Sequence, residues 1–207
     1  MIIAVDGPSA AGKGTVARAV AAHFGFHFLD TGTLYRMVAV ALLQTASDPA
    51  DADKAANIAA SLDPVQFADA DLRSERVASV ASRISAYPSV REKLLDYQRD
   101  FAKRPPGAVL DGRDIGTVVC PDADVKLYIT ASTEVRSRRR FEELRTIDPS
   151  VTEASVLADV RARDHRDTNR AVAPLLPARD AVIIDTTAMA REEAIATAIS
   201  AVAARRV

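Results

Sequence analysis

Residues 7 to 15 of the chain read Gly7-Pro8-Ser9-Ala10-Ala11-Gly12-Lys13-Gly14-Thr15. An apolar run at residues 1–5 precedes this segment, and residues 16–24 after it read as a helix. A strand, a glycine-bearing loop and a helix in this order are the context of a phosphate-binding loop. Gly7 and Gly12 let the backbone curl so that successive N–H groups point toward an anion. The helix adds the positive end of its dipole, and Lys13 adds a mobile charge for the β- and γ-phosphates of a nucleotide.

The end of this loop departs from the common phosphate-loop pattern. Gly14 stands where that pattern has Ser or Thr, and the hydroxyl comes one residue later, at Thr15. This ending is similar to that of the nucleoside monophosphate kinases. The alternative is a glycine-containing turn before an ordinary helix, which the complete spacing disfavours. We therefore predict that residues 7–15 bind the phosphates of a nucleotide.

The composition is that of one globular domain, or one domain with an insert. The chain has 207 residues, 48% of them hydrophobic, which is enough for a substantial core. Its net charge of −1 gives no broad field to attract nucleic acid or an anionic membrane. The single cysteine, Cys120, excludes an intrachain disulfide and disfavours a metal-thiolate cluster. Because no apolar run approaches the roughly 18 residues that span a bilayer, and the first strand starts at once, we expect a cytoplasmic protein.

Apolar runs of strand length alternate with segments in which apolar residues have helical spacing. We predict strands at residues 2–5, 27–29, 108–111, 125–129 and 181–185. Helical spacing covers residues 75–84, 89–101, 135–144, 156–163 and 194–202. This alternation predicts an α/β fold: a five-stranded parallel sheet with helices on both faces and ligands at the carboxyl ends of the strands. We expect a core at about residues 1–45 and 107–207, with residues 46–106 as an insert that acts as a substrate flap.

Polar side chains follow the second strand. That strand ends in Asp30, and a helix follows that Thr31 or Thr33 would cap, leaving Arg36 near the edge of the sheet. One interpretation is a second phosphate site, for an acceptor. The other is a well-capped helix with an exposed arginine, and the residues alone do not separate the two.

The third strand ends in Leu110-Asp111-Gly112-Arg113-Asp114. An acidic residue directly after an apolar strand, in a chain with a phosphate loop, is positioned to hold Mg²⁺ through water. A strand-terminating turn is the alternative interpretation of Asp111. Arg113 and Asp114 come where the ligand crevice should be.

Two arginine-rich segments lie in the second half of the chain. In Arg136-Ser137-Arg138-Arg139-Arg140, either Arg136 or Arg139 packs against the adenine side of a donor, or the run is a solvated face. Farther on, a helix would bring four side chains within about 100° of one another: Arg163, Arg166, Asp167 and Arg170. Clustered guanidinium groups favour an arriving anion, although a salt-bridged surface helix explains the pattern too.

Taken in order, these segments closely resemble the bacterial cytidylate kinase family. The resemblance rests on the phosphate loop, Asp30-Thr31-Gly32 with Tyr35-Arg36, Asp111-Gly112-Arg113-Asp114, and Arg163 to Arg170 followed by Ala171-Val172-Ala173-Pro174-Leu175. It runs essentially from end to end. Asp-Gly-Arg-Asp followed by Ile115-Gly116-Thr117-Val118-Val119 is specific to that family among nucleotide kinases. The resemblance implies transfer of the γ-phosphoryl group of ATP to CMP or dCMP, with Mg²⁺, by a monomer without nucleic-acid or membrane partners.

The resemblance also implies roles for individual residues. The donor's phosphates are expected at residues 7–15, and Mg²⁺ at Asp111, through water, and at Thr15. The acceptor's phosphate is expected at Thr31, Arg36, Arg113 and Arg170, its cytosine at Ser82, Arg91 and Asp114, and its sugar at Arg163 and Asp167. The expected catalytic groups are Lys13, Arg113, Arg163, Arg166 and Arg170, with Arg166 in a mobile lid over residues 159–172.

Two departures from the family pattern stand out. Thr31 replaces the serine that relatives often have, which keeps a hydroxyl in place. Many members carry a β-hairpin before residues 73–77, where this chain has only a short stretch over residues 63–72. The alternatives are a kinase for UMP or AMP, which the trio Ser82, Arg91 and Asp114 disfavours, and a non-catalytic nucleotide switch, which would not need the arginine cluster.

Overall fold

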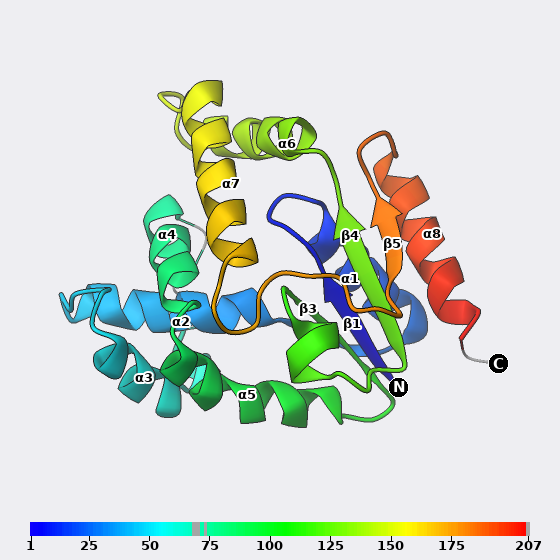
Figure 1. The fold of residues 1–207 in the computed structure, drawn as a ribbon, viewed down its shortest axis with the longest axis horizontal. Coiled ribbons are helices and arrows are strands. Elements are labelled where there is room, and N and C mark those ends of the chain that lie inside the picture. The colour runs from blue at the N-terminus through cyan, green and yellow to red at the C-terminus, as the bar shows by residue number, and fades with distance from the viewer. Residues whose placement is uncertain (68–70, 73, 206–207) are drawn as a thin grey trace. The chain divides into compact units, whose positions relative to one another are not determined.

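The structure, a computed structural model, describes residues 1–67, 71–72 and 74–205. Its strands form one sheet in the order β2-β3-β1-β4-β5. The strands are β1 (Ile2–Asp6), β2 (His27–Asp30), β3 (Ala108–Gly112), β4 (Val125–Thr130) and β5 (Val182–Asp185). β1 is central and pairs in parallel with β3 and β4 (Figure 1). The predicted five-stranded parallel sheet is confirmed, and every predicted strand boundary lies within one residue of the observed one.

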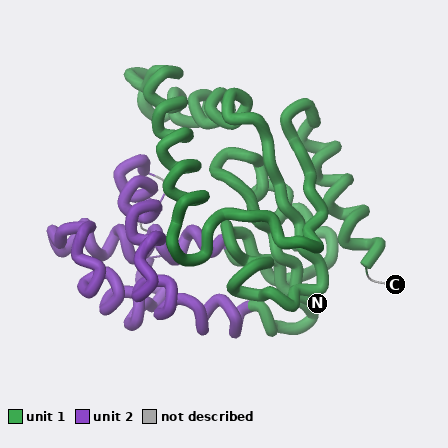
Figure 2. Tube along the Cα trace, in the orientation of Figure 1, with its two compact units in different colours: residues 1–29, 102–207 green, residues 30–101 purple. Residues whose placement is uncertain are grey.

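The chain divides into two compact units, residues 1–29 with 102–207 and residues 30–101 (Figure 2). In the first unit, α1 (Lys13–Phe24) and α8 (Arg191–Ala203) cover one face of the sheet. Val20 and Val202 pack there with Val5 and Leu127 in one buried cluster. On the other face lies a single π-helical turn, η2 (Ile115–Val119). α6 (Thr133–Arg145) and α7 (Glu153–Thr168) pack against each other.

The second unit is helical and has a core of its own. It contains α2 (Thr31–Gln44), α3 (Ala52–Ala60), η1 (Pro64–Phe67), α4 (Glu75–Ile84) and most of α5 (Pro88–Ala102). Leu42, Ile84 and Leu94 are fully or almost fully buried at its centre. Because this division groups α2 with the helical unit, it does not coincide with the functional division expected from the sequence. The substrate-binding insert at 46–106 and the lid at 159–172 therefore stay predictions.

Local details differ from the sequence predictions in two places. Asp30, and not Thr31 or Thr33, is the N-cap of α2, because Thr31 already has helical geometry. α3 was not predicted, although it buries Ala55, Ala56 and Ala59 on one face. The predicted lack of a hairpin over residues 63–72 lies partly outside the described residues; η1 occupies its first part.

Candidate active site

The loop between β1 and α1 has the backbone geometry of an anion cradle. A side chain at Gly7, whose φ is 149°, would place its Cβ 1.9 Å from the backbone oxygen of Ile129 on β4, so only glycine fits. Ala10 and Gly12 also have positive φ values, 60° and 87°. A run of such turns directs successive N–H groups to one side, where an anion binds. The sequence prediction of a strand, a loop and a helix is confirmed at this place.

Lys13 and Asp111 meet beside this loop. The Lys13 Nζ lies 3.5 Å from Oδ1 of Asp111, which is buried at the end of β3. A Cβ at Gly14 would lie 3.1 Å from Oδ2 of the same carboxylate. A side chain at position 14 would therefore lie tightly against the Asp111 carboxylate.

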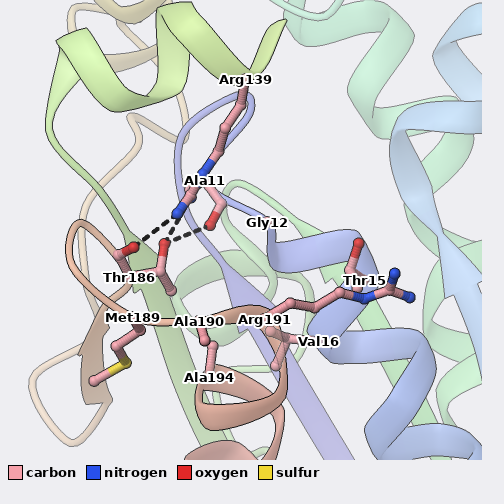
Figure 3. A pocket seen from close by; sticks show the side chains of 10 residues that line it. All are labelled: Ala11, Gly12, Thr15, Val16, Arg139, Thr186, Met189, Ala190, Arg191 and Ala194. Atoms are coloured by element: carbon pink, nitrogen blue, oxygen red, sulfur yellow. Dashed lines mark hydrogen bonds between the residues drawn. The ribbon is translucent and has the colours of Figure 1, made fainter. Parts of the chain in front are cut away.

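A cavity of about 350 Å³ adjoins the loop and the start of α1 (Figure 3). Arg139 of α6 closes one side, where its Nη1 donates to Thr186 Oγ1 (2.9 Å) and its Nη2 to the Thr186 carbonyl (2.8 Å). Thr186 in turn donates to the carbonyl of Ala11 at 3.0 Å. Met189, shortly before α8, and Arg191, the first residue of α8, form another side. This volume is within the range of small-molecule sites, and the cavity continues directly from the phosphate cradle.

A buried carboxylate that sequence reasoning missed holds the loop after β3. Asp6, at the end of β1, accepts hydrogen bonds from the backbone N–H groups of Ile115 and Gly116, both at 2.8 Å. These residues follow directly on Asp114, which is itself buried. Burial raises the pKa of Asp6 to about 7, against the two hydrogen bonds, which favour the ionised form. The signal was present in the sequence, since Asp6 follows an apolar strand in the same way as Asp111.

A second charged cluster surrounds Asp167 near the end of α7. Arg113 Nε donates to Asp167 Oδ2 at 2.8 Å, and Nη2 of Arg170 lies 3.4 Å from Oδ1. Burial alone would raise the pKa of Asp167, but the charges of Arg113, Arg163 and Arg170 lower it. Our prediction that one helix carries all four clustered residues is wrong in one respect. α7 ends at Thr168, with Asn169 as its C-cap, and Arg170 returns to Asp167 from the following loop.

The second unit contains four of the predicted acceptor residues. Thr31 and Ser82 are buried, and Arg36 donates to the carbonyl of Leu72 at 2.7 Å. Arg91 donates to the carbonyl of Ser85 at 3.1 Å. Ser85 Oγ donates to the carbonyl of Ser82 at 2.9 Å, so this serine links two of the predicted cytosine contacts.

The structure distinguishes the arginines of α6, of α7 and of the loop after α7. Of Arg136 and Arg139, only Arg139 lines the cavity; Arg136 is buried beneath the loop. Arg166 is exposed, whereas Arg170 is buried. Within the described ranges, no three acidic, histidine or cysteine side chains gather as a ready-made metal cluster. Nor do those ranges contain a helix long and apolar enough to cross a membrane.

Fold and site together define the class of the protein. A parallel sheet whose central strand runs into a glycine loop, with Lys13 beside a buried acid, is the arrangement of proteins that bind nucleotides through a phosphate loop. A gluconokinase from Sinorhizobium meliloti 1021 has a similar fold, with a TM-score of 0.51 at 15% sequence identity over 98% of this chain and 91% of that one.

Sequence relatives narrow the class to a family. The family model described as cytidylate kinase matches residues 3–204. A cytidylate kinase of Bradyrhizobium sp. strain ORS 278 is 53% identical, over 100% of this chain and 97% of the relative. One of Paramagnetospirillum magneticum strain AMB-1 is 52% identical, over 99% of both chains. The chain belongs to the cytidylate kinase family and is a phosphotransferase.

Proposed function

We propose that this protein transfers the γ-phosphoryl group of ATP to CMP or dCMP, giving ADP and CDP or dCDP. The observation that carries the proposal is the phosphate cradle with Lys13 and Asp111 at the carboxyl edge of the sheet, in a chain of this family. Ligands of open α/β sheets bind at that edge.

The donor's triphosphate would lie along residues 7–15, with Lys13 against the β- and γ-phosphates. The adjoining cavity supports a place for the adenosine, because it opens from Gly12 and Thr15 and is partly apolar at Met189. Arg139, which lines the cavity, would stack on the base.

Mg²⁺ is part of the proposal, and the residues present fit it. Asp111 is buried next to the loop, and Thr15 supplies a hydroxyl at the start of α1. Mg²⁺ prefers oxygen ligands, keeps several waters and takes the rest of its shell from phosphates, so it needs few protein groups. Bound there, the ion would shield the charge of the donor's phosphates. Asp111 would orient it through water.

The acceptor's phosphate, base and sugar would be bound by the residues that the family resemblance implies. These are Thr31, Arg36, Ser82, Arg91, Arg113, Asp114, Arg163, Asp167 and Arg170. We propose that the insert at 46–106 and the lid at 159–172 close over the nucleotides and exclude water, which would otherwise accept the phosphoryl group.

The transfer needs alignment and charge stabilisation more than a base, because an oxygen of the acceptor's phosphate is already anionic. Arg113, Arg163, Arg166 and Arg170 would stabilise the charge that develops on the transferred group. A guanidinium suits this role because its planar fork can contact two oxygens at once. Lys13 would follow the group as it moves.

A coupled assay of ADP formation tests the proposal. The purified protein is given ATP with CMP, dCMP, UMP or AMP in turn, with and without Mg²⁺. We expect turnover with CMP and dCMP that depends on the metal. Preference for UMP or AMP would assign a different acceptor, and no acceptor-dependent turnover would indicate a nucleotide switch. We further propose that the protein is a cytoplasmic monomer without nucleic-acid or membrane partners. Light scattering of the purified protein measures its oligomeric state.

A further inference from the structure

Arg136 of α6 is saturated with hydrogen bonds. Its side chain is only 5% exposed. Nε donates to the carbonyl of Ala131 (2.9 Å), and Nη2 donates to Thr133 Oγ1 (3.1 Å). The remaining N–H groups reach Asp164 Oδ1 (2.9 Å) and Oδ2 (2.6 Å) and the carbonyl of Ser9 (3.3 Å). A guanidinium has five N–H donors, so all of them are used within the protein. Arg136 is therefore not available to contact a nucleotide.

These bonds join two parts of the site. Ser9 belongs to the phosphate-binding loop, and Asp164 lies on α7 between Arg163 and Arg166. The paired contact to Asp164 orients α7 relative to α6 in this structure, because a planar guanidinium and a carboxylate pair best when they are coplanar. The bond to Ser9 fixes the loop from the same point.

The bond to Ser9 also bears on the anion cradle. In a trans peptide the carbonyl and the following N–H point in opposite directions. Holding the Ser9 carbonyl toward Arg136 therefore turns the N–H of Ala10 away from it. Thr186 holds the Ala11 carbonyl in a comparable way, which turns the N–H of Gly12. Ala10 has a φ of 60°, a conformation that is unfavourable for a non-glycine residue, so hydrogen bonds to its neighbours are needed to hold it.

We propose that Arg136 is a positioning residue that holds the phosphate-binding loop and the arginine-bearing helix α7 in one register. It acts on the donor through Ser9 and Ala10, and on the transferred group through Asp164 and its neighbours on α7. The part that concerns the transferred group rests on the proposed function, because Arg163 and Arg166 act on that group only if the protein transfers a phosphoryl group to CMP or dCMP.

The test compares Arg136→Gln, Arg136→Lys, Asp164→Asn and the double variant Arg136→Gln/Asp164→Asn. Arg138→Gln is the matched control, since Arg138 is exposed on the same helix. ADP binding is measured by calorimetry, and kcat, KM for ATP and KM for CMP are measured by the coupled assay. Thermal melting establishes that each variant is folded; if Arg136→Gln does not fold, Arg136→Lys and Asp164→Asn carry the test.

We expect Arg136→Gln to weaken ADP binding by about tenfold or more and to lower kcat, with KM for CMP nearly unchanged. Arg136→Lys should recover part of the loss, because it keeps the charge but not the planar fork. Asp164→Asn should lower kcat and leave ADP binding close to wild type, and the double variant should be no worse than Arg136→Gln.

Wild-type ADP binding and kcat in folded Arg136→Gln would overturn the proposal, and so would additive effects in the double variant. The ADP titration needs no acceptor. If the wild-type protein does not phosphorylate CMP but Arg136→Gln still loses ADP affinity, the proposed function fails while the role of Arg136 in the loop stands.

Discussion

The ammonium group of Lys13 lies 3.5 Å from Oδ1 of Asp111, and their side chains are 13% and 4% exposed. The lysine that should neutralise the donor thus lies against the acid that should orient the metal. Lys13 and Asp111 are 98 residues apart in sequence. They meet because β1 and β3 are neighbours in the sheet, with Val5 opposite Asp111.

This pair leads to the first prediction. Lys13→Ala should lower kcat by about 10²–10³-fold, the loss typical of removing one preorganised electrostatic group. The melting temperature should change by only a few degrees, since α1 keeps its buried face of Val16, Ala17 and Val20. Lys54→Ala, at an exposed position of α3, is the control for loss of a surface lysine. Near-normal turnover in folded Lys13→Ala would rule out its proposed role.

The second prediction concerns Gly7 of the phosphate-binding loop. Gly7→Ala should destabilise the protein by more than about 3 kcal/mol, because its Cβ would overlap the backbone oxygen of Ile129 in β4. Gly25→Ala is the matched control. Gly25 also has a positive φ but has open space around it, so Gly25→Ala should lower the free energy of unfolding by only about 1–2 kcal/mol. Urea unfolding of both variants makes the comparison, and equal losses would show that the conformation, and not the contact with β4, requires glycine at position 7.

The third prediction is a pH dependence of stability that comes from Asp6. Its pKa is raised from 3.8 to about 7 in the folded protein. Between these pH values the folded protein keeps a proton that the unfolded chain has lost, so the stability that Asp6 provides falls as pH rises from about 4 to about 7. A shift of this size corresponds to a change on the order of 4 kcal/mol.

Asp6→Asn removes this titration. The free energies of unfolding of wild type and variant are measured between pH 4 and pH 8 in metal-free buffer. The difference in free energy of unfolding, wild type minus variant, should decrease between about pH 4 and about pH 7 and be level above that range. A difference that does not vary with pH would mean that Asp6 is ionised throughout, held by the N–H groups of Ile115 and Gly116.

The fourth prediction concerns the lid. One carboxylate, Asp167, faces the charges of Arg113, Arg163 and Arg170, so bound phosphates should reduce the repulsion among these arginines. Amides of residues 159–172 should therefore exchange hydrogen more slowly when a bisubstrate analogue fills both sites. Residues 196–203 of α8 serve as the internal reference. Equal exchange in the free and bound protein would favour the alternative of a salt-bridged helix that does not close.

The fifth prediction concerns the base. Cytosine offers an amino donor at position 4 and a bare acceptor at N3, and uracil reverses both. Asp114 is acceptor-only when ionised and Arg91 is donor-only, so both suit cytosine and oppose uracil. Each buried mismatch costs ~1–3 kcal/mol, and we expect CMP and dCMP to exceed UMP by at least ~100-fold in kcat/KM.

Asp114→Ala should shrink that ratio, mainly by reducing turnover of CMP, because it removes the favourable partner and the repulsion together. The measurement is kcat/KM for CMP, dCMP and UMP in wild type and variant. If wild type uses UMP as well as CMP, the assignment of Ser82, Arg91 and Asp114 to the cytosine is wrong.

Local sequence was sufficient for the parts of this protein that depend on neighbouring residues. Periodic apolar runs defined the five strands, and the spacing of Gly7, Gly12 and Lys13 defined the phosphate loop, because strand alternation and loop curvature are properties of a few consecutive residues. Helix α3 was not predicted, although Ala55, Ala56 and Ala59 form a buried face with helical spacing.

Contacts between distant segments were decided only by the tertiary structure. Asp6 meets Ile115 and Gly116, Arg136 joins Ser9 to Asp164, and Thr186 ties Arg139 to Ala11. Each of these pairings depends on which strand ends lie side by side, and strand order is not written in the periodicity of any one segment. For the same reason, the sequence could not distinguish Arg136 from Arg139. In the structure Arg136 is buried and all its donors are used in hydrogen bonds, whereas Arg139 lines the cavity.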